Sequence, residues 1–238
     1  MKLMRRCLIL LFFLACCRLF GQPVQDFGVA YGIEFYSPRS TQDVNEIMST
    51  AIAIMVVEGN KSYFEVSLDT ILGTTLIYDG DSGRGVLLHQ EHEDYYGVRL
   101  QTTELAEYLP EMSFEMEEFI ERKDILGYSC KRVRFRDERG YVDLWVTPEL
   151  KASPGNSSFS YYGIDGFPLE IEDHLGAIVA HYVADTVFFT PARRDLYDLG
   201  VVDFCIPMTY AQYKAGDFPS HRGHNAARRR NERQKKRQ

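Results

Sequence analysis

The sequence predicts a mostly β (α+β) domain in which a curved antiparallel sheet, or an unclosed β-barrel, carries a few short helices. Short segments in which apolar and polar residues alternate recur from residue 29 to residue 189. This alternation is typical of strands with one buried and one solvated face. Clusters of Gly, Asn, Asp and Ser separate the segments and indicate turns. The body of the chain is long enough for a single domain of this kind.

The clearest β pattern lies in Asp124–Leu150, which predicts a hairpin. In its first arm Val133 and Phe135 alternate with arginines, and in its second arm Leu144 and Val146 alternate with other residue types. A polar segment that contains a glycine connects the two arms. We therefore expect the apolar side chains of both arms to face the interior.

Other segments predict the rest of the sheet, with roughly eight to ten strands in all. Met112–Arg122 fits either a strand or a short helix, and we favour a strand because the hairpin follows at once. Short helices are predicted at Thr41–Ser49, Thr103–Leu109 and Arg193–Leu199. The further predicted strands are Val29–Tyr36, Ala51–Val57, Lys61–Leu68, Thr74–Tyr78, Gly85–His89, Tyr95–Leu100, Tyr161–Ile171 and Gly176–Phe189.

Residues 1–21 have the features of a signal peptide. Basic residues precede an apolar run, Leu8–Ala15, which is too short to span a bilayer comfortably. We expect cleavage after Gly21. The alternative is a lipoprotein signal, in which acylation of Cys16 would anchor the protein to a membrane surface.

Charge divides the chain into three parts. The net charge of −7 combines +4 on residues 1–21, +7 on residues 221–238 and −18 on residues 22–220, the predicted single domain. So acidic a body argues against nucleic-acid binding by the folded part. The tail has almost nothing to bury and is expected to be disordered. It either stays solvated or binds an anionic membrane surface through Arg228, Arg229, Arg230, Arg233, Lys235, Lys236 and Arg237.

Two of the five cysteines, Cys130 and Cys205, lie outside the predicted signal peptide. Cysteines in an oxidising compartment often pair, and a disulfide that closes so long a loop would add about 3–4 kcal/mol of stability. The alternative is that both are small buried apolar residues. The sequence leaves both interpretations open.

The densest group of potential metal ligands comprises His89, Glu91, His92 and Glu93. Two histidines and a carboxylate are enough for a zinc site, but we expect this stretch at a hairpin edge or in a loop, where such residues are solvated. No Gly-x-Ser-x-Gly motif is present, and spacing does not support a pairing of cysteine with histidine. We therefore expect no enzyme, no metal and no cofactor, and keep a metallohydrolase as a weaker alternative.

Four short motifs occur in an order that resembles a known family. They are Gly127–Lys131, Trp145–Leu150, Gly166–Ile171 and Phe204–Tyr210. Their succession, over residues 127–210, resembles the GLPGLI-type and related uncharacterised domains of bacterial cell-envelope proteins, which look distantly like the LolA, LolB and LppX group. The resemblance implies an unclosed β-barrel lidded by helices, with acyl chains or lipidated cargo held on the concave face. It implies no catalytic residues.

Together these features predict a non-enzymatic exported protein that binds a hydrophobic ligand, a lipid or lipidated cargo. We expect it in the periplasm, or on the periplasmic face of the outer membrane, of a Gram-negative bacterium. The alternative is a structural or interaction module of the outer membrane with a filled core. Partners and oligomeric state stay open. The candidate ligand-binding residues on the concave face are Phe35, Phe64, Val66, Val133, Phe135, Leu144 and Val146.

Overall fold

The computed structural model of the chain describes residues 26–37, 51–68, 71–108, 115–137, 140–152, 164–174, 178–189 and 194–219. The predicted signal peptide with Cys16, the predicted helix at Thr41–Ser49 and the basic tail lie outside these ranges.

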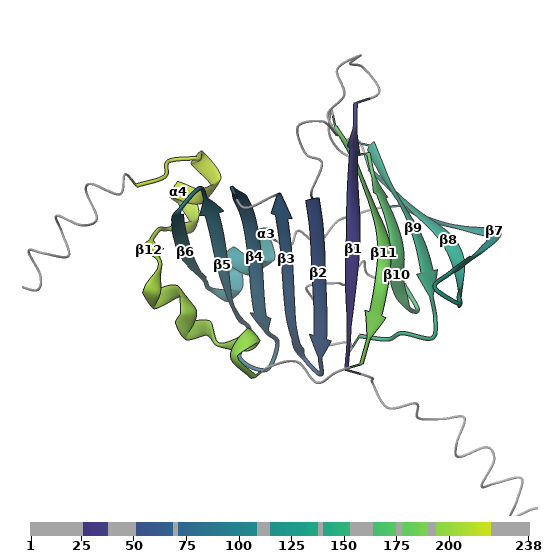
Figure 1. Cartoon of the computed structure of the whole chain (residues 1–238), viewed down its shortest axis with the longest axis horizontal. Coiled ribbons are helices and arrows are strands. Elements are labelled where there is room, and N and C mark those ends of the chain that lie inside the picture. The colour runs from purple at the N-terminus through teal and green to yellow at the C-terminus, as the bar shows by residue number, and fades with distance from the viewer. Residues whose placement is uncertain are drawn as a thin grey trace, which may run out of the picture.

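The described residues form one twelve-stranded sheet in the order β12-β6-β5-β4-β3-β2-β1-β11-β10-β9-β8-β7 (Figure 1). The sheet is curved and does not close on itself, and its helices are few and short, so the predicted fold class is confirmed. The strands are β1 (Phe27–Tyr36), β2 (Ala51–Glu58), β3 (Lys61–Leu68), β4 (Leu72–Asp79), β5 (Arg84–Glu91), β6 (Asp94–Leu100), β7 (Glu115–Ile125), β8 (Tyr128–Asp137), β9 (Gly140–Thr147), β10 (Phe167–Asp173), β11 (Val179–Phe188) and β12 (Ile206–Pro207).

Two antiparallel meanders are joined in the middle by the first strand. β2 to β6 follow one another across one half of the sheet, and β7 to β11 follow one another across the other half. β1 pairs with β2 on one side and with β11 on the other, as Figure 1 shows. Every neighbouring pair is antiparallel except β12 with β6.

Tight turns that favour positive φ angles connect several neighbouring strands. Gly59, between β2 and β3, has a φ of 55°. Leu126 and Gly127, between β7 and β8, have φ angles of 53° and 82°. Two successive positive φ angles match the twist of a two-residue hairpin. Leu126 adopts this backbone conformation although it carries a Cβ, which is uncommon for a bulky residue.

The described helices lie on the half of the sheet that contains β3 to β6. They are α3 (Thr102–Tyr108), α4 (Tyr210–Ala215) and the 3-10 helices η2 (Arg194–Tyr197) and η3 (Leu199–Phe204). Leu105 and Tyr210 join the buried cluster formed by Leu76, Leu87 and Val98. None of the helices in the described ranges has the length and apolar character to cross a membrane.

The α4 helix was not expected from the sequence, yet its ends carry clear signals. The Thr209 side chain accepts a hydrogen bond from the Gln212 backbone N–H, and the Gln212 side chain accepts one from the Thr209 backbone N–H. This reciprocal arrangement is a capping box. Gly216 ends the helix with a φ of 66°.

One edge of the sheet is covered by the segment that follows β11. β12 pairs with β6, and η3 packs so close to β6 that a Cβ on Gly97 would lie 2.5 Å from Val202 Cγ2 and 2.9 Å from Cys205 Cβ. Only glycine therefore permits this approach. The opposite edge is β7, the last strand in the described order.

Replacing Gly97 by alanine should push η3 away from β6. We expect Gly97→Ala to lower the free energy of unfolding by about 1–3 kcal/mol, the usual cost of overpacking. The matched control is Gly73→Ala on β4, where the nearest atom to a new Cβ lies at an ordinary 3.5 Å. Urea denaturation measures both variants, and equal midpoints would contradict this explanation of Gly97.

Candidate functional site

The seven predicted ligand-binding side chains lie on one face of the sheet. Side chains of directly paired antiparallel residues project to the same side. The register pairs Val133 with Leu144, Leu144 with Ile171, Ile171 with Tyr182, and Tyr182 with Ile33. The apolar alternation of β8 and β9 is therefore continuous with that of β1 across the sheet.

Four of the seven side chains are fully packed. Val133, Phe135, Leu144 and Val146 form a buried cluster with Val142, and none of the five is more than 3% exposed. In the structure they belong to the core and do not offer an accessible surface.

The other three, Phe35, Phe64 and Val66, are only half-buried and pack against the largest core cluster. Leu68 and Tyr182 share this environment. We name these five residues the apolar surface. The sequence interpretation did not include Leu68 and Tyr182, although Leu68 shares the period-two alternation of β3.

Small residues lie between the two parts of the apolar surface. β2 separates β3 from β1, and it places Ala53 opposite Val66 and Ala51 opposite Leu68. The larger side chains of β3 and β1 thus flank a strand that contributes alanine at these positions. Side-chain volume on this face is therefore smaller at positions 51 and 53 of β2 than at the paired positions of β3.

The opposite face of β7 to β10 carries Cys130 and Trp145, which belong to the main core cluster or pack against it, and a polar part that is organised by two buried carboxylates. The first is Asp143, which accepts hydrogen bonds from Arg134 Nε at 2.7 Å, Arg134 Nη2 at 2.5 Å and Arg132 Nη2 at 2.8 Å. Burial by itself raises the pKa of Asp143, but the hydrogen bonds and charges of the two arginines outweigh it and lower that pKa. The ring of Phe119 lies 4.8 Å from the Arg132 guanidinium.

The second buried carboxylate is Glu170. Its Oε1 lies 3.1 Å from His181 Nε2, and its other oxygen accepts a hydrogen bond from Lys123. The Lys123 ammonium lies 5.5 Å from the centre of the Trp145 ring. Burial favours a higher pKa for Glu170, but His181 and Lys123 reverse this and lower it. The hydrogen bond to Glu170 raises the pKa of His181 in turn.

Both clusters therefore satisfy charges that would otherwise be buried without partners. Each positive group has its carboxylate beside it, so these described residues have a structural role.

Removing the negative charge of Asp143 should leave two arginines with no buried partner. We expect Asp143→Asn to lower the free energy of unfolding by about 2–4 kcal/mol. The control is Asp165→Asn, because the ion pair of Asp165 with Lys151 is largely exposed and should contribute at most about 1 kcal/mol. Equal effects of the two substitutions in urea denaturation would refute the role given to Asp143.

Stability should depend on pH through His181. Because its pKa is higher in the folded than in the unfolded protein, the contribution of His181 is complete below its unfolded pKa and is lost as pH rises through the folded pKa. The stability difference between the wild type and His181→Gln should therefore be larger at about pH 5.5 than at about pH 9.

His89 provides the comparison for this measurement. Burial lowers the pKa of His89, so the difference between the wild type and His89→Gln should change in the opposite direction with pH. Parallel pH profiles for the two variants would contradict both assignments.

The two cysteines do not pair in the structure, which favours the second of the two interpretations that the sequence leaves open. Cys130 and Cys205 are both free thiols. Cys130 lies on β8 near one end of the strand order, whereas Cys205 precedes β12 at the other end. Neighbouring strands are about 4.8 Å apart, so this separation far exceeds the Cα distance of about 6 Å that a disulfide needs.

Cys130 fits the alternative interpretation of a small buried apolar residue. Its side chain is fully buried and belongs to the main core cluster. Burial, with smaller contributions from Asp124, Glu149 and Glu170, raises the pKa of the Cys130 thiol to about 11. The thiol is therefore protonated at neutral pH and is a poor nucleophile.

The potential metal ligands His89, Glu91, His92 and Glu93 do not form a metal-binding group in the structure. β5 ends at Glu91, so Glu93 lies in the turn before β6 together with His92. The His89 ring instead stacks on Phe218 at 4.8 Å and lies 6.0 Å from the Tyr213 ring. Among the described residues, no group of three His, Cys, Asp or Glu side chains could hold a metal ion.

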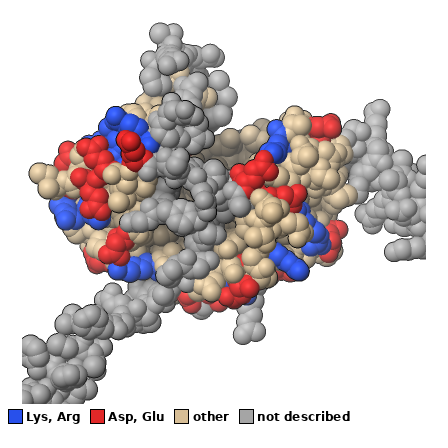
Figure 2. All heavy atoms as spheres, turned by 180° about the vertical axis from the view of Figure 1, so that it is seen from behind, with Lys and Arg blue, Asp and Glu red and all other residues tan. Residues whose placement is uncertain are grey.

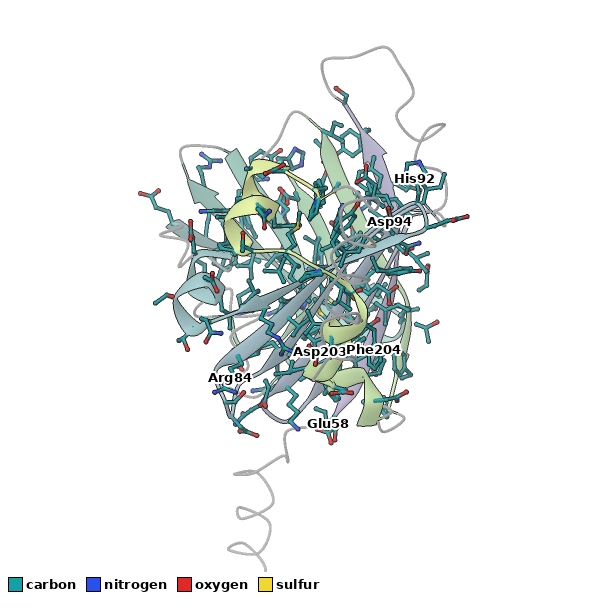
Figure 3. All side chains as sticks on the ribbon, turned by 90° about the vertical axis from the view of Figure 1, so that its left-hand side faces the viewer. Glu58, Arg84, His92, Asp94, Asp203 and Phe204 are labelled. Atoms are coloured by element: carbon teal, nitrogen blue, oxygen red, sulfur yellow. The ribbon has the colours of Figure 1, made fainter. Side chains whose placement is uncertain are left out.

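The described surface carries charges of both signs. In Figure 2, acidic and basic side chains are interspersed on both halves of this face of the molecule. At the β6 end, Arg99 forms an ion pair with Asp203 at 2.5 Å. Phe204, the residue after Asp203, is 90% exposed. Figure 3 shows Asp203 and Phe204 together on η3.

Fold and site together define a curved, unclosed β-sheet protein with an apolar surface on one face and two satisfied ionic clusters on the other. Residues 40–156, just under half of the chain, match the model of a family described as a domain of unknown function, DUF4412. No curated protein sequence matches the chain. The comparisons do not confirm the GLPGLI-type resemblance.

Solved structures resemble the chain only distantly. The structure of PNGF-II in the P21 space group has a TM-score of 0.49 and 16% sequence identity over 80% of this chain. The match covers 32% of that structure, so this chain spans about a third of its length. A LolA superfamily protein, NE2245 from Nitrosomonas europaea, has a TM-score of 0.23 and 13% identity, with 74% of this chain and 91% of that one covered.

Proposed function

We propose that this chain is a non-enzymatic, exported cell-envelope protein that binds a hydrophobic ligand, a lipid or lipidated cargo at the apolar surface. The observation that carries the proposal is the half-burial of Phe35, Phe64, Val66, Leu68 and Tyr182 on one continuous sheet face. A protein that only packs its core has no need for a contiguous set of large apolar side chains that stay partly accessible.

The nature of this surface favours an apolar ligand over a polar one. Three of its five side chains, those of Phe64, Val66 and Leu68, are aliphatic or phenyl groups and come from the single strand β3. Binding sites for small molecules are typically concave and mainly apolar, with few polar groups. An acyl chain needs contact area and no specific hydrogen bonds, which is what this face offers.

The polar clusters support the non-enzymatic part of the proposal. Asp143 and Glu170 are held by charged partners, and the thiol of Cys130 is buried and protonated. A periplasmic location, and contact of the basic residues at 228–237 with anionic lipid, complete the proposal. The second candidate function is an interaction module with a filled core, which the tight packing of Val133, Phe135 and Leu144 favours.

Native mass spectrometry of the protein isolated from its host tests the proposal. We expect a bound mass in the range of a lipid or fatty acid on the wild type. Substituting both Phe64 and Val66 by glutamine should weaken binding at least tenfold, because two apolar contacts worth about 1–2 kcal/mol each are lost and about 1.4 kcal/mol corresponds to a factor of ten.

The control for this experiment is Glu65→Gln, which changes the same strand on the opposite face. This variant should keep the bound mass of the wild type. Reproducible absence of any bound mass from the wild type would reject ligand binding and favour the interaction module.

A further inference from the structure

The two edges of the sheet differ in a way that points to an interaction surface. The β6 edge is covered by β12 and η3. The β7 edge is hydrogen-bonded to β8 alone among the described strands, and Figure 1 shows it at the free end of the sheet. β7 is eleven residues long, and ten of these are at least partly exposed. An uncovered edge of this length can pair with another chain.

A bulge in the middle of β7 pushes one apolar side chain outward. Glu118 pairs with Val133 and Arg122 pairs with Lys131, so three residues of β7 stand opposite Arg132 alone. Phe119 and Glu121 both turn toward Arg132. The residue between them, Ile120, is 98% exposed.

Four of the seven charged residues of β7 are arranged with opposite signs about Ile120. Two glutamates, Glu117 and Glu118, lie three and two residues before it, and Arg122 and Lys123 lie two and three residues after it. Glu117 is paired with Arg134 and Lys123 with Cys130, which places both on the polar face. Glu118 and Arg122 lie on the other face by the same register.

We infer that β7 is the contact surface for a second copy of this chain, packed antiparallel about a two-fold axis through Ile120. A two-fold axis normal to the sheet keeps each face on the same side. It brings Glu118 of one copy opposite Arg122 of the other, on both sides of the axis. Glu117 and Lys123 of the two copies meet in the same way on the polar face, and the two Ile120 side chains meet at the centre.

The sign inversion is the reason to choose a second copy as the occupant. In a two-fold contact, residue i of one chain meets residue j of the other, and j meets i. A strand from an unrelated partner would need charges complementary to β7 but no such inversion within β7 itself. The charges could instead serve to prevent β7 from pairing with other strands, but that role would require only charged residues, in any order.

The contact should be weak and salt-sensitive. The bulge interrupts a continuous backbone ladder, so the contact relies on one apolar pair and four ion pairs. Two of the side chains in these pairs, Glu118 and Lys123, also form ion pairs with Lys131 and Glu170 within each copy. We expect a reversible dimer that dissociates at concentrations of about 10–100 μM. About 0.5 M salt should shift it toward the monomer by screening the ion pairs.

Sedimentation velocity of the purified protein with complementary charge swaps tests this inference. Glu118→Lys and Arg122→Glu each place like charges opposite each other in a dimer of identical copies, and each should weaken self-association at least tenfold. An equimolar mixture of the two variants should dimerise again, because lysine then faces glutamate and arginine faces glutamate in the mixed pair.

Exposed apolar residues provide the second arm. Ile120→Asp should abolish the dimer, whereas Phe204→Asp, a similarly exposed site on η3 at the other end of the sheet, should leave it unchanged. A wild type that stays monomeric at about 200 μM, a concentration above the expected dissociation range, overturns the inference. Self-association that Ile120→Asp leaves intact, or a mixture that fails to restore the dimer, also overturns it.

Discussion

The pairing of β1 with β11 is the interaction on which the rest of this structure depends. Each meander could form its own hairpins from neighbouring segments, but among the described strands the two meanders are hydrogen-bonded into one sheet only through β1. Tyr31 lies opposite Ala184, and its hydroxyl donates a hydrogen bond to the Pro168 carbonyl at 2.8 Å. This pairing of β1 with β11, called the β1–β11 seam below, joins the two meanders into one sheet. It also makes the apolar faces of the two meanders continuous.

The continuous apolar face has two parts that differ in how tightly they are packed. On β8 and β9 the apolar side chains are sealed into a core, while on β3 and at Phe35 and Tyr182 they stay partly accessible. The reverse face of β7 to β10 carries Asp143 and Glu170, each enclosed by cationic partners. Pairing each buried charge with a partner of opposite sign offsets the cost of burying it.

Local features of the fold could be predicted from the sequence, and non-local ones could not. Alternation located nearly every strand, because period two is a property of neighbouring residues. It also placed Phe64 and Leu144 on one face. It could not reveal that Leu144 is sealed and Phe64 is not, since that depends on which segments cover each part of the sheet. The separation of Cys130 from Cys205 could not be predicted for the same reason. β8 and β12 lie near opposite ends of the sheet, and no local sequence pattern encodes the strand order. The η3 helix is only six residues long, so a helical repeat of apolar residues cannot be recognised in its sequence.

The β1–β11 seam also sets an order of events during folding. Strands β2 to β6 can pair with their sequence neighbours as successive hairpins, and strands β7 to β11 can do the same. The β1 edge that faces β11 pairs only when residues 143 to 160 positions further along the chain are available, since Tyr36 pairs with Val179 and Gly28 with Phe188. Closing so large a loop is slow compared with forming a hairpin. Until it closes, the molecule consists of two half-sheets, one of which includes β1, and the open edge of β1 offers an unpaired backbone to any other strand.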